Sequence, residues 1–267
     1  MDENSVTEKI EGARAYEKLH VPALFGQWAP RVSDAAKIES GQRILDVACG
    51  TGVLAREAVS RVSPDGFVAG VDPDAGMLAL AEQLEPTVDW RQGVAEALPF
   101  PDQIFDSCVS QFGLMFFNDR EQALREMMRV LVPGGRLAIA VWDILEHNAA
   151  YPVEVELLQR IAGQAAADAL RAPFILGDIQ ELREIFADAG IAAVEINTQT
   201  GIARFPNIRA MVEADLRGWL PVMGVELEQQ QIAEILAQAE SMLQQFVDDN
   251  GQVTFESPAH IVTGIRH

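Results

Sequence analysis

The chain has 267 residues, of which 49% are hydrophobic, and its formal net charge at pH 7 is −20. This length and composition predict one α/β domain with a large appendage rather than two independent domains. The negative charge repels phosphate backbones, so a nucleic acid is disfavoured as a partner or substrate. The 2 cysteines and 4 histidines have no metal-ligand spacing, and we expect no metal site.

Apolar runs and the start of the chain indicate where the protein resides. Every wholly apolar run is far shorter than the ~20 residues that a membrane-spanning helix needs. The N-terminal stretch MDENSVTEKIEG has neither the basic start nor the apolar segment of a signal peptide. We therefore expect a soluble, cytoplasmic protein without a membrane span.

The N-terminal part of the chain has the pattern of a helix. Residues 7–37 are expected to be helical, with a break at Val21-Pro22 because proline lacks a backbone donor. We assign residues 1–40 to an N-terminal helical cap. The apolar run at residues 43–48 then predicts a buried strand that leads into a glycine loop.

Strands and helices alternate over residues 41–145. Further strands are predicted at residues 67–72, 88–93, 105–111 and 136–142. The segments between several of them carry apolar residues at the i, i+3, i+4 spacing of amphipathic helices. This alternation predicts βαβ units in a doubly wound, Rossmann-like α/β fold with a parallel sheet. We assign residues 41–145 to a cofactor-binding core.

The second half of the chain, residues 146–267, is expected to complete the sheet and to add helices. Asp178 is a predicted helix cap, and strands are expected near residues 192–204 and 252–266. Helical insertions are expected at about residues 146–177 and 206–250. Because ligands of open α/β sheets lie at the carboxyl ends of the strands, such insertions commonly form lids. The stripe that includes Trp219 is interpreted as lid or dimer core, which leaves a homodimer open.

The stretch VACGTGVLA at residues 47–55 contains G-x-G-x-x-A, a form of the dinucleotide-binding fingerprint. Glycines allow a sharp turn from strand to helix, and the following helix N-terminus favours an anion. Asp46, just before this loop, is unfavourable beside a pyrophosphate. It suits the ammonium of S-adenosylmethionine, whose carboxylate can meet the N–H groups of the loop. Asp72, which ends the next strand, suits any adenosine ribose.

Four motifs in order resemble the class I S-adenosylmethionine-dependent methyltransferases, and more narrowly the group that includes the quinone-biosynthesis enzymes. They are ILDVACGTGVLA, VAGVDPDAGMLALA, VAEALPFPDQIFD and ALREMMRVLVPGGRLAIAVWD. The resemblance covers about residues 40–145. It implies a seven-stranded sheet with an antiparallel last strand, S-adenosylmethionine as cofactor and methyl transfer to a small molecule.

The resemblance also implies roles for ten residues. The methionine end would be lined by Asp46, Ala48, Gly50 and Gly52, and Asp72 would bind the ribose hydroxyls. Pro73, Met77, Val94 and Ala95 would surround the adenine, and the carbonyl of Ser110 would accept from the methionine ammonium. Two departures matter: many relatives have glycine at Ala48 and aspartate at Val94. Without that aspartate, adenine recognition is expected to rest on backbone, on Glu96 or on packing.

Aromatic side chains and one histidine are candidates for the acceptor side. The expected pocket residues are Tyr16, Trp28, Phe112, Met115, Phe116 and Trp142. Ordinary core positions are the alternative for each of them. His147 follows the fifth strand and is the candidate general base, with an exposed helix start as the alternative.

The favoured function is methyl transfer, by in-line displacement, to a small apolar or aromatic O-, N- or C-acceptor. A nicotinamide-dependent oxidoreductase is one alternative, which Asp46 and the scarcity of lysine disfavour. A non-catalytic protein that binds S-adenosylmethionine is the other, because this chemistry needs no obligatory catalytic residue.

Overall fold

The computed structural model describes residues 3–267, in which seven strands form one mixed sheet of order β3-β2-β1-β4-β5-β7-β6. Five strands are parallel, namely β1 (Arg43–Val47), β2 (Phe67–Asp72), β3 (Asp89–Gln92), β4 (Phe105–Gln111) and β5 (Leu131–Trp142). The last strand, β7 (Val253–Ile265), runs antiparallel to β5 and to β6 (Val194–Phe205). The predicted seven-stranded sheet with an antiparallel last strand is therefore confirmed.

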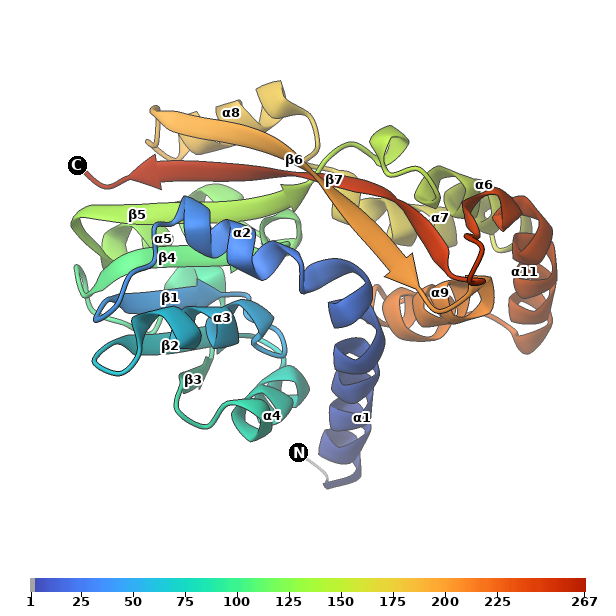
Figure 1. Ribbon diagram of the computed structural model, residues 1–267, viewed down its shortest axis with the longest axis horizontal. Coiled ribbons are helices and arrows are strands. Elements are labelled where there is room, and N and C mark those ends of the chain that lie inside the picture. Colours follow the sequence, from blue (N-terminus) through green and yellow to red (C-terminus); the bar gives the residue numbers. More distant parts are fainter. Residues whose placement is uncertain (1–2) are drawn as a thin grey trace.

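Helices cover both faces of this sheet. The helices are α2 (Trp28–Ala35), α3 (Val53–Val62), α4 (Ala75–Leu84), α5 (Arg120–Val130) and α8 (Ile179–Asp188). On one face α2 contacts α3, and on the other α5 contacts α8 (Figure 1). Burial on two faces explains why the central strands are continuous apolar runs instead of alternating ones.

Helix starts follow the local signals of the sequence. The carboxylate of Asp178 accepts from the backbone N–H groups of Gln180 and Glu181, so the predicted cap of α8 is confirmed. Asp74 caps α4 in the same way, by accepting from Gly76 and Met77. Such caps satisfy N–H groups that have no partner within the helix.

The N-terminal segment starts beside the end of the sheet at which the parallel strands finish and continues onto one face of the sheet (Figure 1). It consists of α1 (Glu3–His20), the π-helical turn η1 (Val21–Phe25) and α2. The break predicted at Val21-Pro22 is this π-helical turn, so the chain changes pitch there without leaving the helix. Gln27 ties the segment to β6, because its amide donates to the carbonyl of Ile202 and accepts from the N–H of the same residue.

Two helical insertions gather at the same end of the molecule (Figure 1). The first, between β5 and α8, contains η4 (Leu145–His147), α6 (Tyr151–Ile161), α7 (Gln164–Arg171) and η5 (Ala172–Phe174). The second, between β6 and β7, contains α9 (Ile208–Ala214), η6 (Asp215–Trp219), α10 (Leu220–Val222), α11 (Gln229–Met242) and η7 (Gln244–Phe246). The two insertions are joined by contacts of α11 with α6.

Strand register explains how the second insertion reaches the site. β5 pairs with β7 only from Arg136↔Ile265 to Trp142↔Ala259. The pairing of β6 with β7 continues beyond this point to Phe205↔Val253. The two strands therefore project past the sheet as a ribbon that carries α9 to α11 toward α1 (Figure 1).

Candidate cofactor and acceptor site

The glycine loop between β1 and α3 has three residues in the left-handed region. Gly50 has a φ of +53° and Gly52 a φ of +85°, and a Cβ added to Gly52 would lie 2.4 Å from the Trp90 ring. Ala48 also has a positive φ, of +56°, which costs a residue with a side chain about 1–2 kcal/mol. Its methyl group is accommodated because Gly113 faces it, where a Cβ would lie 2.6 Å away.

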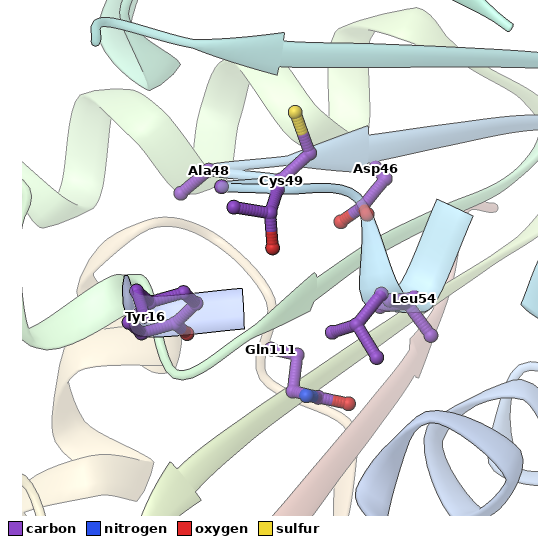
Figure 2. A pocket seen from close by; sticks show the side chains of 9 residues that line it. Tyr16, Asp46, Ala48, Cys49, Leu54 and Gln111 are labelled. Carbon is purple, nitrogen blue, oxygen red and sulfur yellow. The ribbon is translucent and has the colours of Figure 1, made fainter. Parts of the chain in front are cut away.

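A cavity lies against this loop, between it and α1 (Figure 2). It is lined by Tyr16, Asp46, Ala48, Cys49, Gly50, Thr51, Val53, Leu54 and Gln111. Asp46, Ala48 and Gly50 are therefore brought together as predicted, whereas Gln111, from the end of β4, was not expected from the sequence. The amide of Gln111 donates to the carbonyl of Phe25, and this bond ties η1 to the floor of the site.

The carboxylate of Asp46 is the most unusual group of the cavity. The residue is 1% exposed, and neither oxygen has a hydrogen-bond partner among the described residues. Burial raises the pKa of Asp46 well above its ordinary value. The backbone N–H of Ala55, which lies near the carboxylate but outside normal hydrogen-bond geometry, opposes this rise, and the nearby charge of Asp72 adds to it. Figure 2 shows both oxygens directed into the cavity. A buried acceptor of this kind fits a cationic hydrogen-bond donor and disfavours a pyrophosphate.

Asp72 ends β2 beside the loop and holds it in place. One carboxylate oxygen accepts from the N–H of Gly50 at 2.8 Å, and the other from the N–H of Asp74 at 2.9 Å. Burial raises the pKa of Asp72, and these two hydrogen bonds oppose that rise. Each oxygen keeps one lone pair, so ribose hydroxyls can still donate to it.

The residues expected around adenine lie at the ends of β2 and β3. Pro73 and Val94 are exposed, Met77 is half-buried and Ala95 is buried. Val94 immediately precedes the turn η2 (Ala95–Ala97) and is 43% exposed. One carboxylate oxygen of Glu96, Oε1, accepts from the N–H groups of Asn118 and Asp119. Oε1 of Glu96 is therefore engaged by the segment before α5, and adenine recognition through Glu96 stays a prediction.

Helix α1 is fastened over the cavity by Glu17, which the sequence did not single out. The hydroxyl of Thr51 donates to one Glu17 oxygen, and the guanidinium of Arg56 lies 2.6 Å from the other. The neighbouring Tyr16 lines the cavity, and burial together with the charges of Glu17 and Asp72 raises its pKa. Thr51 is therefore the loop's anchor for α1.

Five aromatic rings, which we call the aromatic group, continue from Tyr16 toward β5. The group consists of Tyr16, Phe25, Trp28, Phe112 and Trp142. Phe112 and Trp142 stack with centroids 3.8 Å apart and 8° between their planes. Phe112 has a φ of +58°, an uncommon conformation for a bulky residue.

The remaining predicted residues lie in different surroundings. Trp28 is 0% exposed and Met115 is 3% exposed, so both are core positions. Phe116, in the turn η3 (Leu114–Phe116), is 41% exposed and packs against Trp219 of the second insertion. Ser110 is fully buried in β4, next to Gln111, and its hydroxyl has no partner among the described residues.

His147 lies in η4 and does not line the cavity. Its side chain is 58% exposed, and its Nδ1 is 2.9 Å from one carboxylate oxygen of Asp143. The other oxygen of Asp143 is 3.2 Å from Nε2 of the buried His260. His260 is also bonded to Thr198 and Gly177, which indicates a structural role for this pair of interactions.

Comparison with known proteins identifies the family of the chain, and this family agrees with the geometry of the cavity. Residues 45–139 match the family model described as a methyltransferase domain. The chain is 33% identical over 208 residues to the ubiquinone/menaquinone biosynthesis C-methyltransferase UbiE of Cronobacter sakazakii. The aligned residues cover 71% of this chain and 83% of that protein. The chain belongs to the class I S-adenosylmethionine-dependent methyltransferases.

Two other similarities agree with the assignment of the chain to this family. A 2-phytyl-1,4-naphtoquinone methyltransferase of Thermosynechococcus vestitus is 41% identical over 133 residues, which is 48% of this chain but only 59% of that protein. A methyltransferase structure from an antibiotic biosynthesis pathway of Anabaena variabilis has a TM-score of 0.63 at 17% identity, covering 88% of this chain and 96% of that one. The latter similarity concerns the fold.

Family membership decides between the functions considered from the sequence. The methyltransferase is an enzyme that transfers a methyl group from S-adenosylmethionine to a small molecule. A nicotinamide-dependent oxidoreductase and a non-catalytic binding protein are therefore not supported. No helix within residues 3–267 is long and apolar enough to cross a membrane.

Proposed function

We propose that the methyltransferase acts on a hydroxylated aromatic ring of the quinone type, in its reduced state. The names of the relatives above support this class, and so does the aromatic group beside the cavity. The observation that carries the proposal is the ring of Tyr16, which lines the cavity and stacks on Phe25 at 5.3 Å. The buried stacked pair Phe112 and Trp142 packs against Phe25 and supports this wall. A flat ring binds favourably against such a wall.

We further propose that the cofactor occupies the cavity and the neighbouring strand ends. Asp46 would accept from its ammonium, and the N–H groups of the glycine loop would bind its carboxylate. Asp72 would accept from the ribose hydroxyls, while Pro73, Met77, Val94 and Ala95 would flank the adenine. The carbonyl of Ser110 would face the ammonium from β4. The partnerless oxygens of Asp46 support this placement.

The chain's own residues would bind the cofactor, orient the acceptor and exclude water from the site. The bound cofactor supplies a methyl group already activated on a cationic sulfur. Because the positive charge is lost as the methyl group moves, a dry site of low dielectric favours the transfer. Helix α1, fastened by Glu17, would keep water out, and the aromatic group would hold the acceptor ring in line with the methyl group.

Three further expectations depend on the sequence alone and stay proposals. The net charge of −20 argues against nucleic acid as a substrate. A homodimer through the second insertion and a cytoplasmic location are proposed on the sequence patterns described above.

The substrate class is tested with S-adenosylmethionine labelled in its methyl group. The enzyme is incubated with 2-alkyl-1,4-naphthohydroquinones and benzohydroquinones under dithionite, with the oxidised quinones, and with primary amines. We expect labelled product from the hydroquinones only, and NMR of the product identifies the methylated atom. Turnover of amines without turnover of any hydroquinone would contradict the proposal.

A further inference from the structure

A second group of buried polar side chains lies between α1 and the two insertions, and we call it the acid–histidine cluster. It consists of His20 at the end of α1, Glu154 in α6 and Asp215 at the start of η6. Glu154 is 0% exposed and Asp215 is 4% exposed. Nε2 of His20 lies 3.9 Å from a carboxylate oxygen of Asp215, which is the ion-pair contact that the described residues provide for this acid.

The polar atoms of the cluster are not satisfied within the described part of the protein. Nδ1 of His20 has no hydrogen-bond partner there, and the oxygens of Glu154 meet no donor other than a proton shared with Asp215. Buried polar atoms are nearly always paired in native proteins, so an unpaired imidazole nitrogen beside two buried acids needs an explanation. A purely structural contact between helices would be served better by apolar side chains.

Burial and mutual repulsion determine how the cluster is protonated. Burial raises the pKa of Glu154 well above its ordinary value, and the charge of Asp215 raises it further. Burial also raises the pKa of Asp215, but the adjacent His20 opposes this rise. The proton shared by the two acids therefore belongs on Glu154, and Asp215 carries the negative charge that faces His20. The other titratable groups that face the cluster are Tyr16 and Tyr151.

The cluster is connected to the cofactor cavity through Tyr16. The Tyr16 ring, which lines the cavity, stacks on the His20 ring with centroids 5.5 Å apart. The same ring stacks on Phe25 of the aromatic group at 5.3 Å. His20 is thus one helical turn from a cavity-lining residue and adjoins the wall proposed to hold the acceptor.

Two π-helical turns meet at the cluster. His20 immediately precedes η1, and Asp215 is the first residue of η6. Turns of this type are rare and frequently occur at functional sites. Because the three side chains come from α1, α6 and η6, a separation of α1 from the insertions would expose all of them to an entering acceptor.

We propose that the acid–histidine cluster binds a hydroxyl of the acceptor and that His20 is the general base that accepts its proton. The inference depends on the proposed function, because only a hydroxylated acceptor has this proton to lose. The acceptor O–H bond breaks, the proton moves to Nδ1 of His20, and the electron pair remains on oxygen or is delocalised into the ring. Asp215 is a positioning residue that stabilises the imidazolium, and Glu154 holds Asp215 through its proton.

The test compares two acceptors that differ in acidity. The first is a hydroquinone turned over by the wild-type enzyme, and the second is a nitro-substituted analogue whose hydroxyl is already ionised at the assay pH. His20→Gln is expected to lower kcat for the first by about 10²- to 10⁴-fold and for the second by less than about tenfold. Asp215→Asn is expected to show the same preference with a smaller loss.

Matched controls separate chemistry from folding. His267→Gln and Glu156→Gln change exposed residues of the same types, and Glu156 lies on the same helix as Glu154. Binding of S-adenosylhomocysteine, measured by calorimetry, is expected to stay within about twofold of wild type in the cluster variants. The split between kcat and KM provides a second readout, since loss of a general base is expected to lower kcat more than it raises KM.

The outcomes distinguish this inference from the function on which it depends. Equal losses for both acceptors would show that His20 is structural, and the inference would be overturned. The same holds if His147→Gln, rather than His20→Gln, produces the selective loss. A wild-type enzyme that methylates no hydroquinone at all would instead refute the proposed function, and the inference would fall with it.

Discussion

Replacing Asp46 with asparagine is expected to stabilise the cofactor-free enzyme and to weaken cofactor binding. The carboxylate is 1% exposed and has no partner among the described residues. Its pKa is raised by burial, so the native state binds more protons than the unfolded state above the ordinary value. The free energy of unfolding therefore falls as the pH rises from the ordinary pKa of an aspartate toward the raised pKa of Asp46. At neutral pH the buried acid makes the folded state less stable.

The magnitudes follow from the cost of a buried unpaired group. Asparagine removes the cost of ionising the buried acid but remains a buried polar side chain, so the free energy of unfolding should rise by only about 1 kcal/mol, or Tm by roughly 2–4 °C. A hydrogen bond between a carboxylate and an ammonium is worth about 1.5–3 kcal/mol, so affinity for S-adenosylhomocysteine should fall about 10- to 100-fold. The two effects have opposite signs, which general damage to the fold would not produce.

Two measurements check this prediction. Thermal unfolding without ligand reports the stability, and isothermal titration with S-adenosylhomocysteine reports the affinity. Asp249→Asn, which changes an exposed aspartate, is the matched control and should alter neither quantity. A lower Tm for Asp46→Asn, or an unchanged affinity, would refute the assignment of Asp46 to the cofactor ammonium.

Three further predictions concern the loop, the adenine side and the acid–histidine cluster. Gly52→Ala should lower the free energy of unfolding by at least about 2 kcal/mol in urea titrations, whereas Gly41→Ala, which has a similar φ and an open environment, should cost less. Val94→Asp should tighten S-adenosylmethionine binding by up to about 1 kcal/mol in calorimetry, and unchanged or weaker binding would contradict the missing-aspartate argument. Because the pKa of Glu154 is raised, the wild type should lose stability as the pH is increased from 5 to 8, whereas Glu154→Gln should not. The Tm difference between the two proteins should therefore grow with pH, and a pH-independent difference would count against a buried titrating acid.

Local signals in the sequence were sufficient for the scaffold. Hydrophobic periodicity predicted the strands, because a parallel sheet covered on both faces requires continuous apolar runs. The carboxylate of Asp178 and the glycines of the loop act within a few residues of themselves, so their roles can be inferred from neighbours in the chain. The order of four motifs then indicated the methyltransferase family, which the comparisons confirm.

Several features of the site were beyond such local inference. Ala48 was noted as a departure from the glycine of many relatives, but only the fold shows its positive φ and the glycine at position 113 that makes room for its methyl group. Glu96 looked available for adenine, yet its Oε1 is engaged by the segment before α5. His147 looked close to the reaction, yet its side chain is largely exposed.

The sequence by itself determined the sheet, the glycine loop and the cofactor, because each depends on local patterns and on their order along the chain. The tertiary structure alone decided which distant side chains meet. Glu17 joins Thr51, and His20 joins Asp215, through contacts between segments that are far apart in the chain. Such contacts leave no periodic trace in a single sequence, since a buried acid on a helix reads like any other polar position until its neighbours are known.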